Sequence, residues 1–324
     1  MDFTETILRW YAENGRDLPW RRTRDPYAVW LSEIILQQTR VAQGRAYWER
    51  FMERFPTVRD LASATEGEVL RLWQGLGYYS RARNLHAAAK QIVAQGGFPT
   101  TLEGIRALKG VGDYTAAAVG SIAFGLPAAV VDGNVYRVLA RYFGIATPVG
   151  STAAKKEFTE RAQRLLPADN PGAFNQGLMD FGATCCTPVN PACLTCPLQP
   201  SCQAFRDGRV DLLPVKQTAA KPLERRLTYV YVRVDGRIAI HRRGPGDIWQ
   251  GLWEPWLTDE VPAGAQPVIK GFRHQLTHRT LLADFYRWEP AVRPPLPDGY
   301  VWIEEAELDA YAKPRLFERL LEKL

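Results

Sequence analysis

The sequence predicts an all-helical N-terminal region joined by a linker to a small α+β domain. From residue 3 to about residue 184, apolar residues recur at helical spacing between short loops. Residues 206–225 combine prolines and mixed charge without a periodic apolar face, which is typical of a linker. Beyond them, the turn dipeptide Asp235-Gly236 separates two apolar stretches and indicates a β-hairpin.

Helices of the first region are expected wherever apolar side chains line one face. Asp25 can cap a helix that has Pro26 at its first position, because aspartate accepts bonds from the free N–H groups there. A short helical pattern, residues 102–108, precedes a glycine-containing turn. The longer segments with helical spacing are residues 3–14, 26–38, 82–95, 115–125, 134–144 and 172–183.

The second region shows strand patterns followed by a helical one. The hairpin comprises residues 226–234 and 237–243, and residues 280–288 and 299–303 are further strand candidates. Residues 304–324 return to helical spacing. A small mixed α+β unit is therefore expected, and the chain contains no internal repeat.

Composition narrows the class of protein. With 324 residues, 46% hydrophobic and 23% charged, the chain is neither a disordered tail nor a small disulfide scaffold. Its net charge is +6, and most of the positive excess lies before residue 225, which suits a polyanionic partner. Because no apolar run is long enough to span a membrane and no targeting signal opens the chain, we expect a soluble cytoplasmic monomer.

Five cysteines cluster near the end of the helical region, which in a reducing compartment favours a metal site over disulfides. Cys186, Cys193, Cys196 and Cys202 are spaced x6, x2 and x5. Thiolates select zinc or an iron–sulfur cluster. Structural zinc more often uses two close Cys-x-x-Cys pairs, so a [4Fe–4S] cluster is favoured and zinc remains the alternative. Cys185 is expected to be a small buried apolar residue.

Gly110 and Gly112 form a Gly-x-Gly turn between two helical patterns. Glycines permit positive φ and leave backbone N–H groups open at a helix N-terminus, where one phosphate can bind. Most such turns only connect helices. The positive charge of this region and the cysteine loop strengthen the phosphate-binding interpretation.

Glu33 and Asp132 are candidate catalytic carboxylates. Glu33 has apolar neighbours on both sides, which raise the pKa of a carboxyl and allow it to act as a general acid. Asp132 precedes a helix that it can cap, and the helix dipole favours its ionised form. One neutral acid and one carboxylate can cleave a glycosidic bond. The alternatives are a solvated glutamate and a purely structural cap.

The chain resembles the helix–hairpin–helix DNA glycosylases of the endonuclease III superfamily. The resemblance rests on Gly110-Val111-Gly112, on Asp132-Gly133-Asn134 about 20 residues later, and on the cysteine spacing. Three further stretches are similar to the adenine-specific, MutY-type members of that superfamily, and they occur in the same order. They are residues 30–39, 75–81 and 175–186.

The resemblance implies a domain organisation. Residues 1–205 would form a helix-hairpin-helix glycosylase domain with its cluster loop at 186–202. Residues 206–225 would be the linker, and residues 226–324 a Nudix-like domain that recognises 8-oxoguanine.

The resemblance also implies base-excision repair of double-stranded DNA. The enzyme would flip out adenine mispaired with 8-oxoguanine or guanine and hydrolyse its N-glycosidic bond. Glu33 would protonate adenine N7, and Asp132 would stabilise the oxocarbenium ion. Tyr114 and Asn134 match family residues that support this charge.

Further positions match family residues that contact DNA. An exposed aromatic can fill the space that a flipped base leaves in the stack. Core packing is the alternative for one of the adjacent Tyr78 and Tyr79. The matching positions are Trp20, Arg21, Leu36 and Asp180 for the adenine pocket, Gln38 and Tyr78 beside the oxidised guanine, and Gly110 and Gly112 for the backbone.

Tyr114 stands where endonuclease III carries a lysine. That lysine forms a Schiff base with the abasic sugar and leads to strand cleavage. A phenol cannot do so, and a monofunctional glycosylase is therefore predicted. Lys109 replaces the usual proline before the hairpin and either adds a phosphate contact or has no effect.

The C-terminal region resembles the Nudix-like domain of the family but lacks the acidic Nudix box, so no second hydrolase activity is expected. The family's usual Phe-Ser-His loop is replaced by Leu276-Thr277-His278, which keeps a hydroxyl and an imidazole. Preference for 8-oxoguanine should survive if Thr277 and His278 carry it, and weaken if ring stacking does.

Two other functions remain open from the sequence. A thymine mismatch glycosylase of the same superfamily would share the cysteine loop and a hairpin tyrosine. A noncatalytic iron–sulfur DNA-binding protein would use Glu33 and Asp132 only as a surface charge and a cap. The additional C-terminal domain argues against the first, and the family context of both carboxylates argues against the second.

Overall fold

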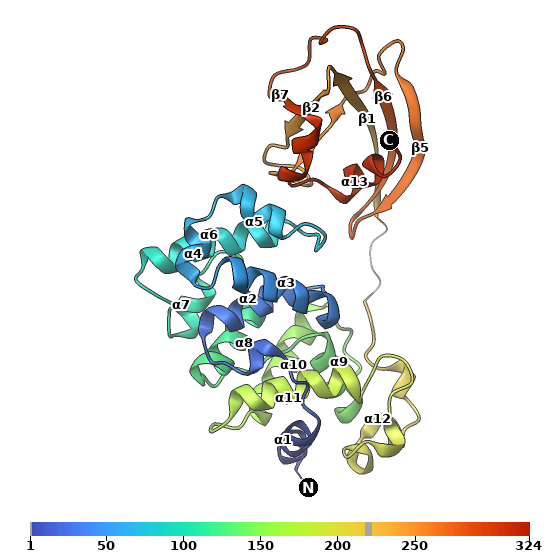
Figure 1. The fold of residues 1–324 in the computed structure, drawn as a ribbon. Coiled ribbons are helices and arrows are strands. Elements are labelled where there is room, and N and C mark those ends of the chain that lie inside the picture. The colour runs from blue at the N-terminus through green and yellow to red at the C-terminus, as the bar shows by residue number, and fades with distance from the viewer. Residues whose placement is uncertain (1, 218–221) are drawn as a thin grey trace. The chain divides into compact units, whose positions relative to one another are not determined.

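The computed structural model describes residues 2–217 and 222–324, which form two compact units (Figure 1). One unit contains residues 2–62 and 87–217, and the other contains residues 63–86 and 222–324. Part of the predicted linker, residues 218–221, lies outside the described residues. None of the described helices is both long and apolar enough to span a membrane.

The chain before residue 218 is helical, as predicted, and the helices expected from apolar spacing begin and end within about two residues of their predicted bounds. The α-helices are α1 (Phe3–Asn14), α2 (Pro26–Leu36), α3 (Val41–Arg54), α4 (Val58–Ser63), α5 (Glu66–Leu72), α6 (Ser80–Ala94), α7 (Leu102–Arg106), α8 (Asp113–Phe124), α9 (Gly133–Phe143), α10 (Thr152–Leu165), α11 (Pro171–Thr184) and α12 (Gln203–Arg206). Short 3-10 helices lie between α1 and α2 (Pro19–Arg21) and between α11 and α12 (Cys193–Thr195 and Gln199–Ser201).

Helices α3 and α10 are not among the segments that apolar spacing predicts. Each buries few residues along its 14-residue length: Gly44 and Phe51 in α3, and Ala154, Phe158 and Ala162 in α10. Their exposed faces are charged, so the apolar pattern is too sparse to identify them.

A hydrophobic core connects the first helix with α9, α10 and α11. Phe3 of α1, Phe158 of α10 and Phe174 of α11 are buried in it. Four of the cysteines pack partly against the same core. The core therefore fixes the cysteine loop and the start of α9 on one scaffold.

Residues 63–86 pack with the C-terminal residues in one unit. Arg83 donates a hydrogen bond to the Gln250 carbonyl at 2.7 Å, and Glu66 pairs with Arg242 at 2.8 Å. The predicted domain 1–205 included this segment. Helical spacing shows that a segment has an apolar face, but not which core that face joins.

A seven-stranded mixed sheet forms most of the second unit (Figure 1). The predicted hairpin is present, with Asp235 and Gly236 at φ 49° and 75°, and β6 pairs in parallel with β1. β5 was not predicted, because register shifts around Gly271 interrupt its alternation. The strands are β1 (Leu223–Val234), β2 (Arg237–Arg242), β3 (Trp253–Glu254), β4 (Trp256–Leu257), β5 (Gln266–Gln275), β6 (Arg279–Trp288) and β7 (Tyr300–Glu304).

The C-terminal segment is divided in two. A 3-10 helix, η5 (Glu305–Ala310), and helix α13 (Arg315–Leu321) replace the single helical pattern expected for residues 304–324. Pro314 stands at the N-cap of α13, because proline is tolerated at a helix start but not in its interior. Leu308 and Phe317 pack with strand residues in the core of this unit.

Candidate active site

Glu33 lies on α2, a helix that is buried on nearly all sides. Asp25 caps it by accepting a hydrogen bond from the Tyr27 N–H at 3.1 Å, and Pro26 takes the first position, as predicted. Every residue from 27 to 35 is buried, and Glu33 is only 8% exposed. The alternative of a solvated glutamate is therefore wrong.

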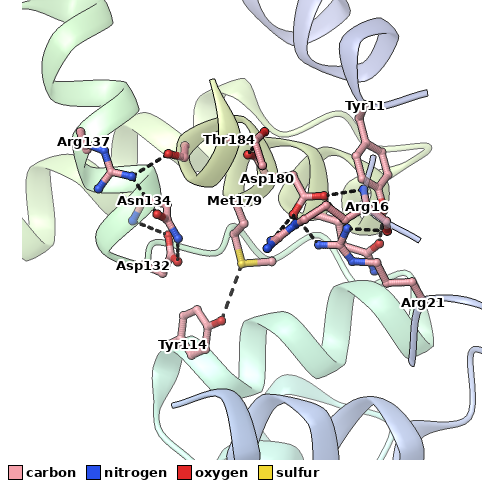
Figure 2. Close-up of polar contacts among 12 residues, drawn as sticks. Tyr11, Arg16, Arg21, Tyr114, Asp132, Asn134, Arg137, Met179, Asp180 and Thr184 are labelled. Atoms are coloured by element: carbon pink, nitrogen blue, oxygen red, sulfur yellow. Dashed lines mark hydrogen bonds and ion pairs between the residues drawn. The ribbon is translucent and has the colours of Figure 1, made fainter. Parts of the chain in front are cut away.

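The carboxyl of Glu33 accepts a hydrogen bond from the Tyr114 hydroxyl at 2.8 Å. Burial raises the pKa of Glu33 to about 7, and the negative charge of Asp132 raises it as well. The hydrogen bond from Tyr114 lowers this pKa but does not outweigh burial. The Tyr114 hydroxyl also lies 3.6 Å from the Met179 sulfur (Figure 2). Glu33 can thus hold or release a proton near neutral pH.

Asp132 is the N-cap of α9, as predicted. Its carboxylate accepts hydrogen bonds from the N–H groups of Asn134 and Val135, at 2.9 and 2.8 Å, and from the Asn134 side-chain amide at 2.8 Å. Burial raises the pKa of Asp132, and these hydrogen bonds limit the rise. The hydrogen bonds stabilise the ionised form of Asp132, which is the effect expected of the helix dipole. Burial destabilises that ionised form.

Arg137 connects the start of α9 to the end of α11 (Figure 2). Its guanidinium donates to the Asn134 side-chain oxygen at 2.8 Å and to the carbonyls of Gly182 and Cys186 at 2.7 Å each. A Cβ at Gly182 would lie 2.6 Å from the Cβ of Asn134. The two helices can therefore approach this closely only because residue 182 is glycine.

Asp180 is fully buried on α11 and binds two arginines (Figure 2). Arg16 donates to it from its backbone at 3.0 Å and from Nε at 2.9 Å, and Arg21 donates through both terminal nitrogens at 2.5 and 2.8 Å. Burial alone would raise the pKa of Asp180, but the hydrogen bonds from Arg21 and Arg16 outweigh it and hold that pKa below its usual range.

The other two residues assigned to the adenine pocket, Trp20 and Leu36, both approach α3. Trp20 is buried, with its ring edge against Trp48 at 5.7 Å between centroids. Leu36, at the end of α2, is half-buried and approaches Gly44 of α3.

The predicted Gly-x-Gly turn connects α7 to α8. Gly110 has φ 76°, which favours glycine, and Gly112 is the N-cap of α8 without a side-chain cap. The Lys109 N–H donates to the Gln91 side chain at 2.7 Å, a bond that proline could not make. Asp113 is bound by Arg106 and Lys155, so its negative charge is compensated next to the turn.

Cys186, Cys193, Cys196 and Cys202 line one small cavity. Among the described residues, no His, Cys, Asp or Glu group is arranged to hold a single metal ion. Thiols are ligands both of iron–sulfur clusters and of structural zinc.

The residues predicted to contact the oxidised guanine fall in both units. Tyr78, 48% exposed and at φ 46°, belongs to the second unit, where its hydroxyl contacts that of Thr277. Thr277 and His278 are exposed in the turn between β5 and β6. Tyr79 is the buried member of the tyrosine pair, and Gln38, exposed at φ 57°, follows α2 in the first unit.

The structure thus places the buried Glu33 in contact with Tyr114 and within electrostatic range of Asp132, both of which are half-buried. Sequence reasoning did not identify Arg16, Met179, Arg137 or Gly182, which hold or approach the predicted residues. No local signal could have identified Arg16, because its partner Asp180 lies 164 positions away. Gly182 carried a weak signal as a glycine inside a helical pattern, where glycine is unfavourable unless two elements pack closely.

Two family models match the chain. Residues 31–167 match the HhH-GPD superfamily of base excision DNA repair proteins, and residues 228–323 match the NUDIX domain. Among solved structures, a thermostable thymine-DNA glycosylase is 33% identical with a TM-score of 0.58, covering 63% of this chain and 95% of that one. A trapped endonuclease III–DNA intermediate, 22% identical with a TM-score of 0.55 over 63% and 94% of the two chains, shares the fold.

Curated relatives are similar over much of the chain. Adenine DNA glycosylase of Homo sapiens is 46% identical over 213 residues, 62% of this chain and 39% of that protein. The chain therefore spans less than half the length of that relative. Adenine DNA glycosylases from two Buchnera aphidicola strains are 37% and 32% identical, covering 78% and 86% of this chain and 73% and 84% of theirs.

Proposed function

Because the chain belongs to the adenine DNA glycosylase family, we propose that it hydrolyses the N-glycosidic bond of adenine mispaired with 8-oxoguanine or guanine in double-stranded DNA. The observation that carries this proposal is the hydrogen bond between the buried Glu33 and the half-buried Tyr114, with Asp132 close enough to raise the pKa of Glu33. An acid poised near neutral pH beside a second carboxylate is what glycosidic cleavage requires.

Glu33 is the proposed general acid. With its pKa near 7, a substantial fraction of Glu33 is protonated at neutral pH and can protonate N7 of a flipped adenine. Protonation weakens the bond between the base and the sugar. Once the base has left, the same carboxylate can accept a proton from the attacking water.

Asp132 is the proposed stabiliser of the positive charge on the sugar. Three hydrogen bonds, from the Asn134 and Val135 N–H groups and the Asn134 amide, hold its carboxylate in place. A fixed negative group at the site of a developing cation needs no reorganisation during the reaction. Asn134 and Arg137 are positioning residues, because they act on that carboxylate directly or through each other.

Arg21 and Asp180, with Trp20 and Leu36, are the proposed adenine pocket. Asp180 compensates the charge of Arg21, so the proposed pocket can present polar groups to adenine without an uncompensated buried charge.

Tyr114 has no amine and cannot form a Schiff base. We expect a monofunctional enzyme, whose abasic product breaks only after alkali.

The cysteine loop is proposed to hold a [4Fe–4S] cluster. Cys186, Cys193, Cys196 and Cys202 would be its ligands, and the cavity that they line together supports that assignment. When bound, the cluster would supply structural cross-linking of the loop. Removing it is expected to weaken DNA binding while leaving Glu33 and Tyr114 in contact.

Recognition of the opposite base is proposed to involve the second unit. Tyr78 offers an exposed ring that can fill a gap in the base stack, and its hydroxyl contacts Thr277. His278 is exposed beside Thr277 and can reach a ligand. We therefore assign 8-oxoguanine recognition to Tyr78, Thr277 and His278, with Gln38 as a wedge.

The predicted domain boundaries, 1–205 and 226–324, remain part of the proposal. So does a monomeric, nucleoid-associated state.

The test is single-turnover cleavage of three duplexes, with adenine opposite 8-oxoguanine, adenine opposite thymine and thymine opposite guanine, each with and without alkali. We expect adenine release opposite 8-oxoguanine and strand breakage only with alkali. Glu33→Gln should lower the rate by about 10²- to 10⁴-fold, which is the usual contribution of a general acid. Glu49→Gln, which alters an exposed glutamate paired with Arg45, is the control and should retain the rate.

Other results would redirect the proposal. Thymine release opposite guanine would make the chain a thymine mismatch glycosylase, in line with its similarity to the thermostable thymine-DNA glycosylase. Strand breakage without alkali would contradict the monofunctional assignment. Equal rates for the wild type and Glu33→Gln would remove Glu33 from the mechanism.

A further inference from the structure

The Tyr114 hydroxyl has two acceptors and only one proton to donate. It lies 2.8 Å from a carboxyl oxygen of Glu33 and 3.6 Å from the sulfur of Met179, the second contact being drawn in Figure 2. A phenol donates a single hydrogen bond, so it serves one of these acceptors at a time. A thioether is a weak acceptor, whereas an ionised carboxylate is a strong one. The choice of acceptor therefore depends on the charge of Glu33.

The packing of α11 holds the Met179 sulfur beside this hydroxyl. Met179 is half-buried and packs, together with Tyr114, against one small cluster of buried apolar residues from α8 and the segment that follows it: Ala117, Ala118, Ala128 and Val130. The next residue of α11, Asp180, is bound by two arginines, which fixes the rotation of the helix at this point. The position of the sulfur is therefore set by the fold of the first unit.

Each protonation state of Glu33 uses a different acceptor. When Glu33 is ionised, Tyr114 donates to its carboxylate, which is the stronger acceptor. When Glu33 is protonated, its own O–H can donate to the Tyr114 oxygen, because a protonated carboxyl has a donor. The Tyr114 hydrogen then turns to the sulfur of Met179 at 3.6 Å. In that state the sulfur supplies the acceptor that a largely buried hydroxyl needs.

We propose that Met179 is a positioning residue for the general acid: its thioether accepts the Tyr114 hydroxyl while Glu33 carries a proton and releases it when Glu33 ionises. The benefit to catalysis rests on the proposed function, in which Glu33 gives its proton to the flipped base. As that proton leaves, the Tyr114 hydrogen turns from the sulfur to the new carboxylate. Only hydrogen bonds change at Tyr114 and Met179, so the step needs no other reactant.

The remaining titratable groups around Glu33 act through their charge. The charge of Asp132 raises the pKa of Glu33 and that of Arg21 lowers it, and both act on the pKa of Tyr114 in the same directions. Two further helices, α8 and α3, pack against α2. Their other groups are Asp113 of α8, paired with Arg106 and Lys155, the exposed Arg45, Glu49, Arg50, Glu53 and Arg54 of α3, and Tyr47 under Arg50. None of these charges changes when Met179 is replaced, so a variant there isolates the sulfur.

The first test follows the methyl group of Met179 by NMR in the protein without DNA. The sequence contains three methionines, so methyl-¹³C-methionine labelling gives at most three resonances, and Met179→Leu identifies one of them. The Met179 shift should titrate with a midpoint near pH 7, because the sulfur gains and loses its hydrogen bond as Glu33 titrates. The titration should disappear in Glu33→Gln and lose more than half of its amplitude in Tyr114→Phe.

Met52, half-buried on α3, is the internal control, and its methyl group should not follow Glu33. A Met179 methyl group that does not titrate, or that keeps its full amplitude in Tyr114→Phe, would overturn the proposal. The measurement requires no cleavage, and a protein that releases no base would still show the titration. Failure of this contact and failure of the proposed function are therefore distinguishable.

The second test is a double-mutant cycle on the pH dependence of the single-turnover rate. Leucine fills the space of methionine but cannot accept a hydrogen bond, so Met179→Leu destabilises protonated Glu33 and lowers its pKa. The alkaline limb should move down by about 0.3–0.5 pH unit, as for one weak hydrogen bond, and rates above it should fall about two- to threefold.

In a Tyr114→Phe background, Met179→Leu should cause no further shift of the limb, because the sulfur acts only through the hydroxyl. Met52→Leu, the matched control, should cause no shift in either background. An unshifted limb in Met179→Leu would contradict the proposal. So would an equal shift with and without the Tyr114 hydroxyl, which would reduce Met179 to a packing role.

Discussion

The protonation state of Glu33 is decided by its immediate neighbours. Burial raises the pKa of this carboxyl to about 7, whereas Asp180, which is also buried, has a lowered pKa because Arg21 and Arg16 bind it. The two buried carboxylates therefore differ in pKa because only Asp180 is bound by arginines. One is suited to carry a proton, and the other to remain ionised.

Tyr114→Phe is expected to shift the pH dependence of the reaction. The Tyr114 hydrogen bond stabilises ionised Glu33 and lowers its pKa, so its loss raises that pKa further. The acid then stays protonated to higher pH, and the alkaline limb of the single-turnover rate, near pH 7 in the wild type, should move upward. Tyr27→Phe removes a buried hydroxyl that binds the Phe55 carbonyl and should not move it. An unchanged or downward-shifted limb for Tyr114→Phe would contradict this account.

At the level of elements, the site depends on the close approach of α9 and α11. Asp132 and Asn134 lie at the start of α9, and Gly182 lies near the end of α11. Arg137 joins the two helix ends by bonding Asn134 and the Gly182 carbonyl. A change in the spacing of these helices therefore displaces the Asp132 carboxylate.

Gly182→Ala should lower both stability and activity. The new Cβ would lie 2.6 Å from the Asn134 Cβ and 2.9 Å from its carbonyl oxygen, so α9 must shift. We expect a loss of about 1–3 kcal/mol in the free energy of unfolding, typical of overpacking. Single-turnover rates should fall at least tenfold. Gly67→Ala, at a helical glycine whose Cβ would meet only the Thr65 hydroxyl at 4.0 Å, should be neutral or stabilising. A Gly182→Ala enzyme with wild-type rate would show that the spacing is unimportant.

The hairpin between α7 and α8 should gain one phosphate contact from Lys109. This side chain is exposed beside Gly110, and Asp113 nearby is already bound by two cations. Lys109→Ala should reduce the slope of log binding constant against log salt by about one. Gln91→Ala removes the bond to the Lys109 N–H without removing charge and should leave that slope unchanged. If the wild type and Lys109→Ala have the same slope, Lys109 does not contact a phosphate.

At the level of the whole molecule, contacts between distant segments assemble the second unit. Residues 63–86 join the C-terminal residues through Arg83 with Gln250 and through Glu66 with Arg242. This grouping places Tyr78 beside Thr277, 199 positions later in the chain. The proposed recognition site for the opposite base is therefore made of two segments that fold together.

Thr277→Val should reduce the preference for adenine opposite 8-oxoguanine over adenine opposite guanine. Valine keeps the shape of threonine but removes the hydroxyl that contacts Tyr78. Loss of one hydrogen bond, about 1 kcal/mol, should lower the ratio of the two rates several-fold. Thr277→Ser, which keeps the hydroxyl, should retain the ratio. A ratio that is equal in wild type and Thr277→Val would exclude the hydroxyl from recognition.

Much of this protein follows from local sequence. Apolar periodicity predicted the helices that bury a broad face, and the Asp235-Gly236 turn predicted the β1–β2 hairpin, because both signals act between neighbouring residues. The caps at Asp25 and Asp132 were predictable for the same reason. The candidate catalytic residues came from motif resemblance, since no local rule shows that Glu33 and Asp132 meet.

The tertiary structure alone decided what surrounds each of these residues. The burial of Glu33, the two arginines on Asp180 and the approach of Gly182 to Asn134 depend on contacts between residues far apart in the chain. The same holds for residues 63–86, whose apolar face could have joined either core. A periodic pattern specifies that a face is buried, whereas the choice of partner, and with it the pKa of a carboxyl, is made only when the whole chain packs.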